Sequence, residues 1–179
     1  MPDGLFRTPA LDHAPLAGDA TLAILPAVSR RIFRGGDAAV AAADAVLKFS
    51  LPRQACRANR HGSRAALWLG PDEWLLLALE HDDWAELEHL EPPHALIDVS
   101  HRQVAFALSG PRAADTLNAG CPLDLDVAAF PPGMCTRTVL AKAEIVLWRV
   151  TNTFHIEVAR SFAAYVWDFL AEASLEFRR

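Results

Sequence analysis

Hydrophobic and polar positions divide the first half of the chain into a strand, a helix and a hairpin. Apolar residues over 21–33 predict a strand that ends at two glycines, and the alanine-rich stretch 37–47 predicts a helix capped by Asp37. A loop rich in Pro, Arg and Gly follows at 52–63. Apolar runs on both sides of the sequence Gly-Pro-Asp-Glu then predict two hairpin strands, because Gly and Pro supply the turn dihedrals. A short helix is expected to begin at Asp82.

The second half repeats this order of elements. The alternating run 103–108 predicts a strand, and Gly110 with Pro111 is expected to open a helix that has the proline at its first position. A long loop then leads to a second pair of strands over 143–150 and 153–158. A last helix carries apolar residues at helical spacing. Its expected core-facing positions are Phe162, Tyr165, Val166, Phe169, Leu170 and Ala173.

This repetition predicts an α+β fold made of two duplicated split β-α-β-β (ferredoxin-like) units, in which helices pack on antiparallel sheets. Gly35 corresponds to Gly110 in this scheme, and Trp68 corresponds to Trp148. Prolines and glycines without periodicity predict an extended arm at the N-terminus. The expected boundaries are 1–20 for the arm and 21–95 and 96–179 for two pseudo-repeats of a single domain over 21–179.

Composition and charge narrow the classes of function. Hydrophobic residues make up 52% of the 179 residues and charged residues 22%, so the chain can fill a core. The net charge of −5 at pH 7 argues against nucleic acid or an anionic membrane as a partner. No apolar run approaches the length of about eighteen residues that spans a membrane, and no signal peptide pattern opens the chain. A cytoplasmic protein is therefore expected.

Metal and nucleotide sites are not expected in this chain. The three cysteines form no C-x-x-C pair and the seven histidines show no metal-ligand spacing. Glycine-rich phosphate loops are also missing from the sequence. We therefore expect no metal ligand and no flavin or nucleotide bound by this chain alone.

The stretch IDVSHRQVAFALSGPRAADTL, at 97–117, places Asp98, Ser100 and His101 within four residues. On a strand Asp98 and Ser100 share one face while His101 points to the other, which does not suit a Ser-His-Asp triad. The apolar face lies on odd positions before residue 100 and on even positions from Val104. This slip predicts a kinked strand, explained either by a bulge held by Asp and Ser hydrogen bonds or by a ligand or partner contact.

Six blocks of sequence resemble those of a known superfamily. They are LWLGPDEWLLL (67–77), DVSHRQV (98–104), GCPLDL (120–125), FPPGMCTRT (130–138), KAEIVLWR (142–149) and EVARSFAAYVWDFL (157–170). Together they resemble the folate-binding aminomethyltransferase of the glycine cleavage system. They are more similar to the gamma-subunit family of heterotetrameric sarcosine oxidases.

The resemblance implies an aminomethyltransferase folate-binding-domain-like fold and membership of a complex that oxidises sarcosine with O2 to glycine and H2O2. The one-carbon unit of sarcosine passes to tetrahydrofolate as 5,10-methylenetetrahydrofolate. In that family the alpha subunit carries NAD and a folate-binding domain, the beta subunit carries FAD, a covalent FMN lies between the two, and the delta subunit holds zinc. The gamma chain is expected to bind no cofactor and to act through its alpha, beta and delta partners.

The carboxylate that contacts folate in the aminomethyltransferases has no match here. Those enzymes carry a glycine pair followed by paired aspartates in the hairpin of the second half, where this chain has Lys142, Ala143 and Glu144. No glycine pair allows a close backbone approach to a pterin. We therefore expect no catalytic residue, and the candidates for a remnant folate pocket are Asp98, Ser100, Arg102 and Glu144.

Three residues are candidates for contacts with a partner. Trp167 lies off the main stripe of the last helix, and it either packs at the edge of the core or anchors a subunit contact. Arg57 and Arg60 lie in a loop that is either solvated or meets an acidic partner surface. The leading hypothesis is a non-catalytic gamma subunit that works by binding. The alternatives are a free-standing folate-binding one-carbon transferase or regulator, and a homo-oligomeric structural module.

Overall fold

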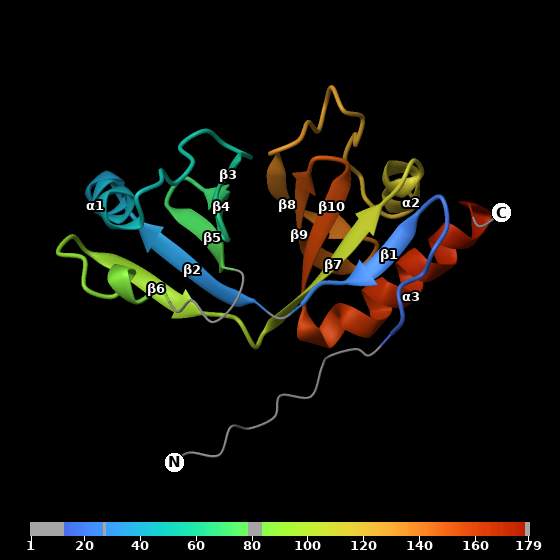
Figure 1. Ribbon diagram of the computed structural model, residues 1–179, viewed down its shortest axis with the longest axis horizontal. Helices are drawn as coiled ribbons and strands as arrows, with labels where there is room; N and C mark the ends of the chain where they lie inside the picture. Colours follow the sequence, from blue (N-terminus) through green and yellow to red (C-terminus); the bar gives the residue numbers. More distant parts are fainter. Residues whose placement is uncertain (1–12, 27, 79–83, 178–179) are drawn as a thin grey trace, which may run out of the picture.

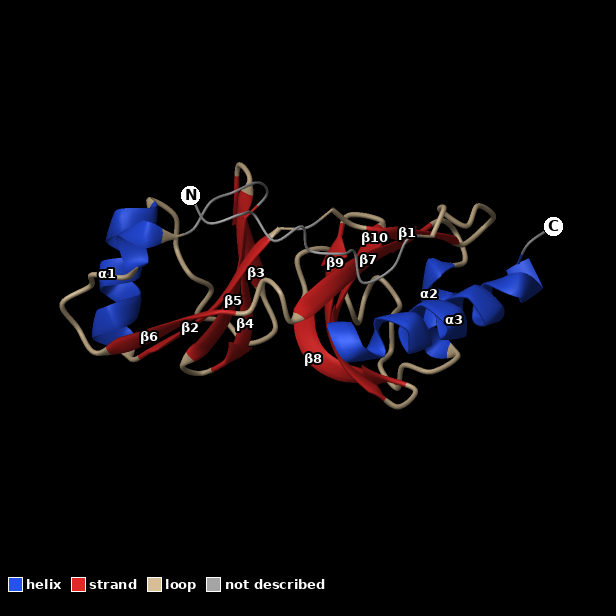
Figure 2. Ribbon diagram, turned by 90° about the horizontal axis from the view of Figure 1, so that it is seen from below, coloured by secondary structure: helices blue, strands red, loops and turns tan. Residues whose placement is uncertain are grey.

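The computed structural model describes residues 13–26, 28–78 and 84–177. Two five-stranded antiparallel sheets lie face to face, and helices cover the outer face of each sheet (Figure 1, Figure 2). The layers therefore run helix, sheet, sheet, helix, which confirms the predicted α+β fold of antiparallel sheets with packed helices. Within the described ranges no helix is both long and apolar enough to cross a membrane.

The first sheet has the strand order β3-β4-β5-β2-β6. The bounds of its strands are β2 (Ser29–Gly35), β3 (Ala58–His61), β4 (Arg64–Gly70), β5 (Glu73–Ala78) and β6 (His94–Asp98). Helix α1 (Asp37–Leu47) and the 3-10 helix η1 (Ala85–Leu87) lie on its outer face. Phe33 and Trp74 of the sheet share one buried cluster with Val40 of α1.

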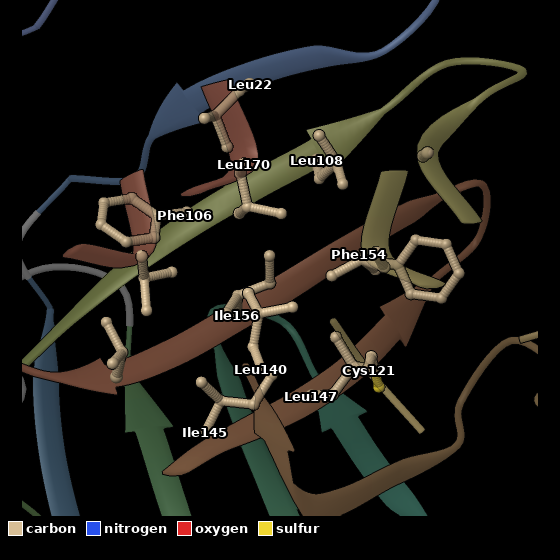
Figure 3. Packing of buried hydrophobic residues seen from close by; sticks show 14 of the residues in the cluster. Leu22, Phe106, Leu108, Cys121, Leu140, Ile145, Leu147, Phe154, Ile156 and Leu170 are labelled. Carbon is tan, nitrogen blue, oxygen red and sulfur yellow. The ribbon is translucent and has the colours of Figure 1, made fainter. Parts of the chain in front are cut away.

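The second sheet has the order β1-β7-β10-β9-β8. Its strands are β1 (Thr21–Ile24), β7 (Gln103–Ser109), β8 (Cys135–Leu140), β9 (Ala143–Val150) and β10 (Thr153–Ala159). Its helices are α2 (Ala113–Asn118), η2 (Arg160–Phe162), α3 (Ala163–Ala173) and η3 (Ser174–Phe177). Figure 3 shows the core beneath them, where Phe106, Leu147 and Ile156 from three strands form one cluster with Leu170 of α3.

The two halves exchange their edge strands. β1 precedes β2 in the chain but pairs with β7 of the second sheet, and β6 precedes β7 but pairs with β2 of the first. Each sheet is therefore completed by a strand that the other half supplies. The expected boundary between residues 95 and 96 falls inside β6. Separating the halves would remove an edge strand from both sheets and expose unpaired backbone groups.

The exchange corrects two sequence predictions. The expected strand 21–33 is two strands, β1 and β2, because the chain leaves one sheet after Ile24 and enters the other at Ser29. Likewise, the expected kinked strand is a break: β6 ends at Asp98, a turn follows, and β7 begins at Gln103 in the other sheet. The slip in apolar phase marks this change of sheet.

The sequence did not predict two of the edge strands. β3 lies in the expected Pro/Arg/Gly-rich loop, and β8 lies directly after the expected long loop. Both lie at a sheet edge. β3 is exposed after its partly buried first residue, and β8 alternates between exposed positions and partly buried or buried ones. Edge strands carry polar and charged residues that prevent further pairing, so their hydrophobic signal is weak.

The helix starts differ in detail from prediction. α1 covers residues 37–47 as predicted, but Gly36 is its N-cap and no side chain caps it, so Asp37 is not the cap. α2 begins at Ala113, and Pro111 therefore precedes the helix. The expected helix start at Asp82 lies outside the described residues.

The buried face of α3 also differs from the expected stripe. Its buried residues are Ala163, Val166, Trp167 and Leu170. Phe162 and Tyr165, which were expected to face the core, are 43% and 38% exposed. The rings of these two residues lie 6.5 Å apart in an edge-to-face arrangement. The aromatic spacing suggested a broad apolar face, but contact with sheet and α2 covers only one side of the helix.

The described part of the expected arm packs on the second half. Leu16 bridges Leu22 of β1, and the Asp19 carbonyl accepts a hydrogen bond from the Arg112 amide at 3.0 Å. Gly110, at φ +105°, makes room for this segment, because a Cβ there would lie 2.3 Å from the Asp19 oxygen. Residues 1–12 of the arm lie outside the described part.

Candidate functional site

The inner faces of the two sheets form a buried layer between the halves. One cluster there joins Ala65, Leu67, Leu75 and Leu77 of the first sheet to Cys135, Val146 and Trp148 of the second. Central strands such as β5 and β9 bury both faces, one against helices and one against the other sheet. The only buried charged residues within the described ranges, Arg30 and Glu157, lie in this layer.

In the first sheet one row of residues runs across this layer. Ala65 of β4 pairs with Leu77 of β5, and Leu77 pairs with Arg30 of β2. The row ends on the exchanged segment, where the Val99 amide donates to the Arg30 carbonyl at 3.0 Å. We call these four residues the Arg30 row.

The second sheet carries the corresponding row. Val146 of β9 pairs with Glu157 of β10, and Glu157 pairs with Ala105 of β7. This row also ends on an exchanged segment, where the Leu25 amide donates to the Ala105 carbonyl at 2.8 Å. We call these four residues the Glu157 row. The same pairing order in both rows relates the two sheets by an approximate twofold.

The rows also correct the expected match of Trp68 with Trp148. Residues 65–68 of β4 pair with β5 in unbroken register and alternate between the two faces, so Leu67 faces the other sheet and Trp68 faces the helix layer. Trp148 pairs with His155 and faces the other sheet. Its counterpart is Leu67, which pairs with Leu75 in the same way. Trp68 lies one position beyond the residue that corresponds to Trp148, and a shift of one position on a strand places a side chain on the opposite face.

Arg30 and Glu157 form an ion pair across the layer. Arg30 Nε donates to Glu157 Oε2 at 2.6 Å and Nη2 donates to Oε1 at 3.3 Å, while the two side chains are only 2% and 5% exposed. Arg30 Nη1 donates to the Val28 carbonyl at 3.3 Å. Burial raises the pKa of Glu157, and the Arg30 guanidinium opposes that rise. The carboxylate thus fastens one sheet to the other and is not free to act as a base.

A cavity of about 330 Å³ opens beside the pair, near the start of β7 and the end of β10. Arg102 and Glu144 line it, together with Gln103, Arg137 and Phe162. The structure thus brings together two of the four candidates for a remnant folate pocket.

The carboxylates of this cavity do not fit folate catalysis. The Glu144 side chain is 78% exposed, and its Oε1 lies 4.0 Å from Arg137 Nε. Arg137 in turn forms an ion pair with Glu73, and Glu157 is held by Arg30. No carboxylate here combines burial with an unpaired state, which a folate-contacting acid or base would need.

The other two candidates, Asp98 and Ser100, do not line this cavity but hold the turn between β6 and β7. Ser100 Oγ accepts a hydrogen bond from the Arg30 amide at 2.9 Å and donates to the Arg30 carbonyl at 3.2 Å. Asp98 Oδ1 accepts from the Ser100 amide at 2.8 Å and lies 3.0 Å from Arg31 Nη1. Burial acts to raise the pKa of Asp98, but hydrogen bonds from Ser100 and the charge of Arg31 outweigh it and lower the pKa. These bonds are structural.

Comparison with known proteins places the chain in a family. Residues 34–176 match the sarcosine oxidase, gamma subunit family. The chain belongs to this family. A sarcosine oxidase subunit gamma of Arthrobacter sp. is 35% identical over 147 residues, which cover 79% of this chain and 72% of the relative. One of Corynebacterium sp. (strain P-1) is 36% identical over 117 residues, 63% of this chain, and the match spans only 58% of that relative.

Solved structures agree with this family. A chain of the heterotetrameric sarcosine oxidase from Corynebacterium sp. U-96 superposes with a TM-score of 0.83 at 29% identity, covering 92% of this chain and 89% of the other. The glycine cleavage system aminomethyltransferase T from Bartonella henselae superposes with a TM-score of 0.62 at 17% identity, over 83% of this chain and 44% of the other. The second likeness concerns the fold alone, and it agrees with the expected aminomethyltransferase-like architecture.

The candidates for partner contacts lie in different settings in this gamma-family chain. Trp167 is 3% exposed, packs edge-to-face on Phe106 at 5.6 Å and stacks on His13 at 5.1 Å. This placement favours the core-packing interpretation of Trp167. Arg57 is half-buried and its backbone bridges Met134, whereas Arg60 is exposed.

Metal and thiol chemistry find no support in the described part of the chain. No group of three His, Cys, Asp or Glu side chains there could hold a metal ion. The three cysteines are free thiols, and burial raises the pKa of Cys135 to about 12. A thiol with so high a pKa is not a nucleophile at neutral pH.

The sequence did not reveal the central pair of the site. Glu157 shares one face of an alternating strand with Thr153 and His155, and this pattern does not show that the face is buried. Arg30 lies in the segment 21–33 that was read as one strand. The signal available was one carboxylate in β10 and three arginines in β2, but only the packing of the sheets brings Arg30 to Glu157.

Proposed function

We propose that this chain is the gamma subunit of a heterotetrameric sarcosine oxidase and that it contributes to assembly, not to the chemistry. The superposition on a chain of the Corynebacterium enzyme over 92% of this chain carries the proposal. In this proposal the complex oxidises sarcosine with O2 to glycine and H2O2 and passes the one-carbon unit to tetrahydrofolate. The enzyme is therefore an oxidoreductase to which this chain belongs as a cytoplasmic subunit.

Alpha, beta and delta subunits are the proposed partners. Under this proposal they hold the FAD, the covalent FMN, the NAD and the zinc, and they provide the site for tetrahydrofolate. Two observations support this division of roles: the carboxylates beside the 330 Å³ cavity are paired or solvated, and the described residues hold no cluster that could bind a metal. This chain would act by binding its partners.

An exposed aromatic pair, Phe162 and Tyr165, is the surface we assign to a subunit contact. Both side chains are more than one-third exposed, and Phe162 also lines the 330 Å³ cavity. Aromatic residues are enriched in interface centres because they bury large areas with little loss of side-chain entropy. Arg57 and Arg60 remain candidates for a contact with an acidic partner surface.

Co-expression with the proposed partner subunits tests the assignment. With this chain present, a tagged preparation should be yellow and should form H2O2 from sarcosine. Without it, the remaining subunits should lose assembly or flavin content. A stable complex of the other subunits with full activity and flavin in its absence would refute the role.

Two further variants test the contact surface. Phe162→Ser with Tyr165→Ser should reduce recovery of the complex, while Val46→Ser, at an exposed position of α1 on the opposite side, should not.

A calorimetric titration of the isolated chain with a reduced folate separates the subunit role from a free-standing folate-binding protein. Micromolar binding in this titration would favour the latter.

A further inference from the structure

A second cavity lies between the sheets, at the other end of β9 and β10. Its volume is about 160 Å³. Trp148 of β9 and His155 of β10 line it, whereas the first cavity meets these strands at Glu144 and Ala159. Glu157 lines both cavities, so the buried ion pair separates them.

Short side chains leave this space open. Ala105 stands in the Glu157 row where Arg30 stands in the Arg30 row, and Ala65 stands where the other row has Val146. Leu25, Val28 and Leu77 add further apolar lining. Protein cores are close-packed, and a cavity of about 150 Å³ with apolar walls is large enough to hold a benzene molecule.

Aromatic rings form one wall of the cavity. Trp148 is 7% exposed, and its indole Nε1 has no hydrogen-bond partner within the described structure. The indole N–H can only donate, and a buried donor without an acceptor is costly. The neighbouring His155 ring packs edge-to-face on the indole at 5.3 Å, and burial together with the charge of Arg60 lowers the pKa of His155. The two rings therefore give this wall an aromatic surface that suits a flat, apolar ligand body.

The rim of the cavity is cationic. Arg60 and Ser63 are exposed and line the cavity, whereas Arg30 and Glu157 at its floor are buried. Within the described ranges Arg60 forms no ion pair with a carboxylate, and its Nε donates to the Gly62 carbonyl at 3.3 Å. Since Arg30 and Glu157 neutralise each other, the charge of Arg60 dominates the lining. A ligand anion at the rim would find a guanidinium ready to pair with it.

We propose that this cavity binds a small monocarboxylate whose apolar body is about the size of a benzene ring. The apolar body lies between the alanine and leucine walls and against the Trp148 ring, and the carboxylate lies near Arg60 and Ser63. The site is distinct from the cavity at Arg102 and Glu144 and does not depend on the chain being an oxidase subunit.

Nuclear magnetic resonance of the full chain with benzoate as the probe tests this proposal. Five tryptophans give separate indole N–H signals, and Trp148→Phe identifies the one at the cavity while keeping an aromatic ring. Benzoate should shift the Trp148 signal saturably at millimolar concentrations. Benzamide, which has the same shape without charge, should bind about tenfold more weakly because the charge-assisted bond is lost.

Two variants locate the ligand. Ala105→Leu fills the cavity and should abolish the shift, and Arg60→Gln changes only an exposed side chain and should weaken benzoate about tenfold. Arg53→Gln, in the same loop but outside the cavity lining, is the matched control and should leave affinity unchanged. If Ala105→Leu does not fold, the surface variants still decide the question.

Three results would overturn the proposal: no saturable shift at Trp148, equal affinity for benzamide and benzoate, or equal loss in Arg60→Gln and Arg53→Gln. Because the isolated chain is used, none of these results bears on whether it assembles into an oxidase. Failure of assembly would equally leave the binding result unchanged.

Discussion

The Arg30 row and the Glu157 row have the same pairing order but different chemistry. Leu77 in one sheet occupies the place that Glu157 occupies in the other, and Ala105 occupies the place of Arg30. An apolar pair on one side of the approximate twofold thus matches an ion pair on the other. The duplicated fold places these four residues at equivalent positions. On one side of the twofold Arg30 and Glu157 form the ion pair, and on the other side Leu77 and Ala105 line the 160 Å³ cavity.

The largest effect should come from breaking the ion pair. Arg30→Ala leaves the Glu157 carboxylate buried without its partner, which should lower the free energy of unfolding by about 3–5 kcal/mol. Adding Glu157→Leu makes both rows present Ala and Leu, and it should recover most of this loss because no buried charge remains unpaired. Urea unfolding followed by tryptophan fluorescence measures both. Arg112→Ala, which removes an exposed pair with Asp115, should change stability by less than about 1 kcal/mol. A double variant no more stable than Arg30→Ala would contradict this account.

The second comparison concerns three glycines. Gly35 ends β2, Gly36 follows it at the start of α1, and Gly110 lies shortly before α2. Gly110→Ala places a Cβ against the Asp19 carbonyl at φ +105° and should cost roughly 1–3 kcal/mol or more, because the obstacle is backbone. Gly35→Ala meets the Ala39 Cβ at 2.7 Å with an ordinary φ and should cost less. Gly36→Ala, with nothing within 4 Å, is the control. Thermal unfolding ranks the three, and equal losses for Gly110 and Gly36 would disprove the packing of the N-terminal segment.

The third largest loss of stability is expected in the turn between β6 and β7. Ser100→Ala removes two hydrogen bonds to the Arg30 backbone and should cost about 1–2 kcal/mol. Turnover per assembled, flavin-loaded complex should not change, because Ser100 touches no reacting group in our proposal. Ser29→Ala, which removes one bond from Arg31, is the milder control. Reduced turnover in an intact complex would show that Ser100 has a role in the chemistry.

The smallest effect should be a dependence of stability on pH. Burial and the nearby charge of Arg60 lower the pKa of His155 below its ordinary value of 6.5. The unfolded chain then binds the proton more readily, so stability is complete above pH 6.5 and falls as the pH drops below it. His155→Leu, which imitates Leu75 at the corresponding position, should remove this part of the dependence. Urea midpoints between about pH 5 and about pH 8 check it, and an unchanged slope in the variant would count against it.

The fold class could be predicted from the sequence because the patterns that indicate strands and helices are local. The apolar alternation of β7, β9 and β10 and the alanine-rich pattern of α1 predicted those elements closely, since each arises from residues adjacent in the chain. The polar edge strands β3 and β8 gave no such signal. The aromatic residues of α3 gave a misleading one, because periodicity shows an apolar face but not which part of it a neighbour covers.

The site was only half predictable. Arg102 and Glu144 were named from family motifs and do line one cavity, whereas Asp98 and Ser100, named from the same motifs, hold a turn. Neither Arg30 nor Glu157 was suspected, because the two residues are far apart in the chain and the bond between them appears only when the sheets meet.

The sequence by itself determined the elements, their repeated order and the family, since periodicity and motifs depend on near neighbours. Only the tertiary structure decided that β1 and β6 exchange sheets, that Trp148 corresponds to Leu67, and that Arg30 meets Glu157. The physical reason is that partner choice across a sheet or between sheets is settled by the burial of whole faces. A crossing of the chain from one sheet to the other, or a shift of one position along a strand, changes which residues meet without changing the local pattern.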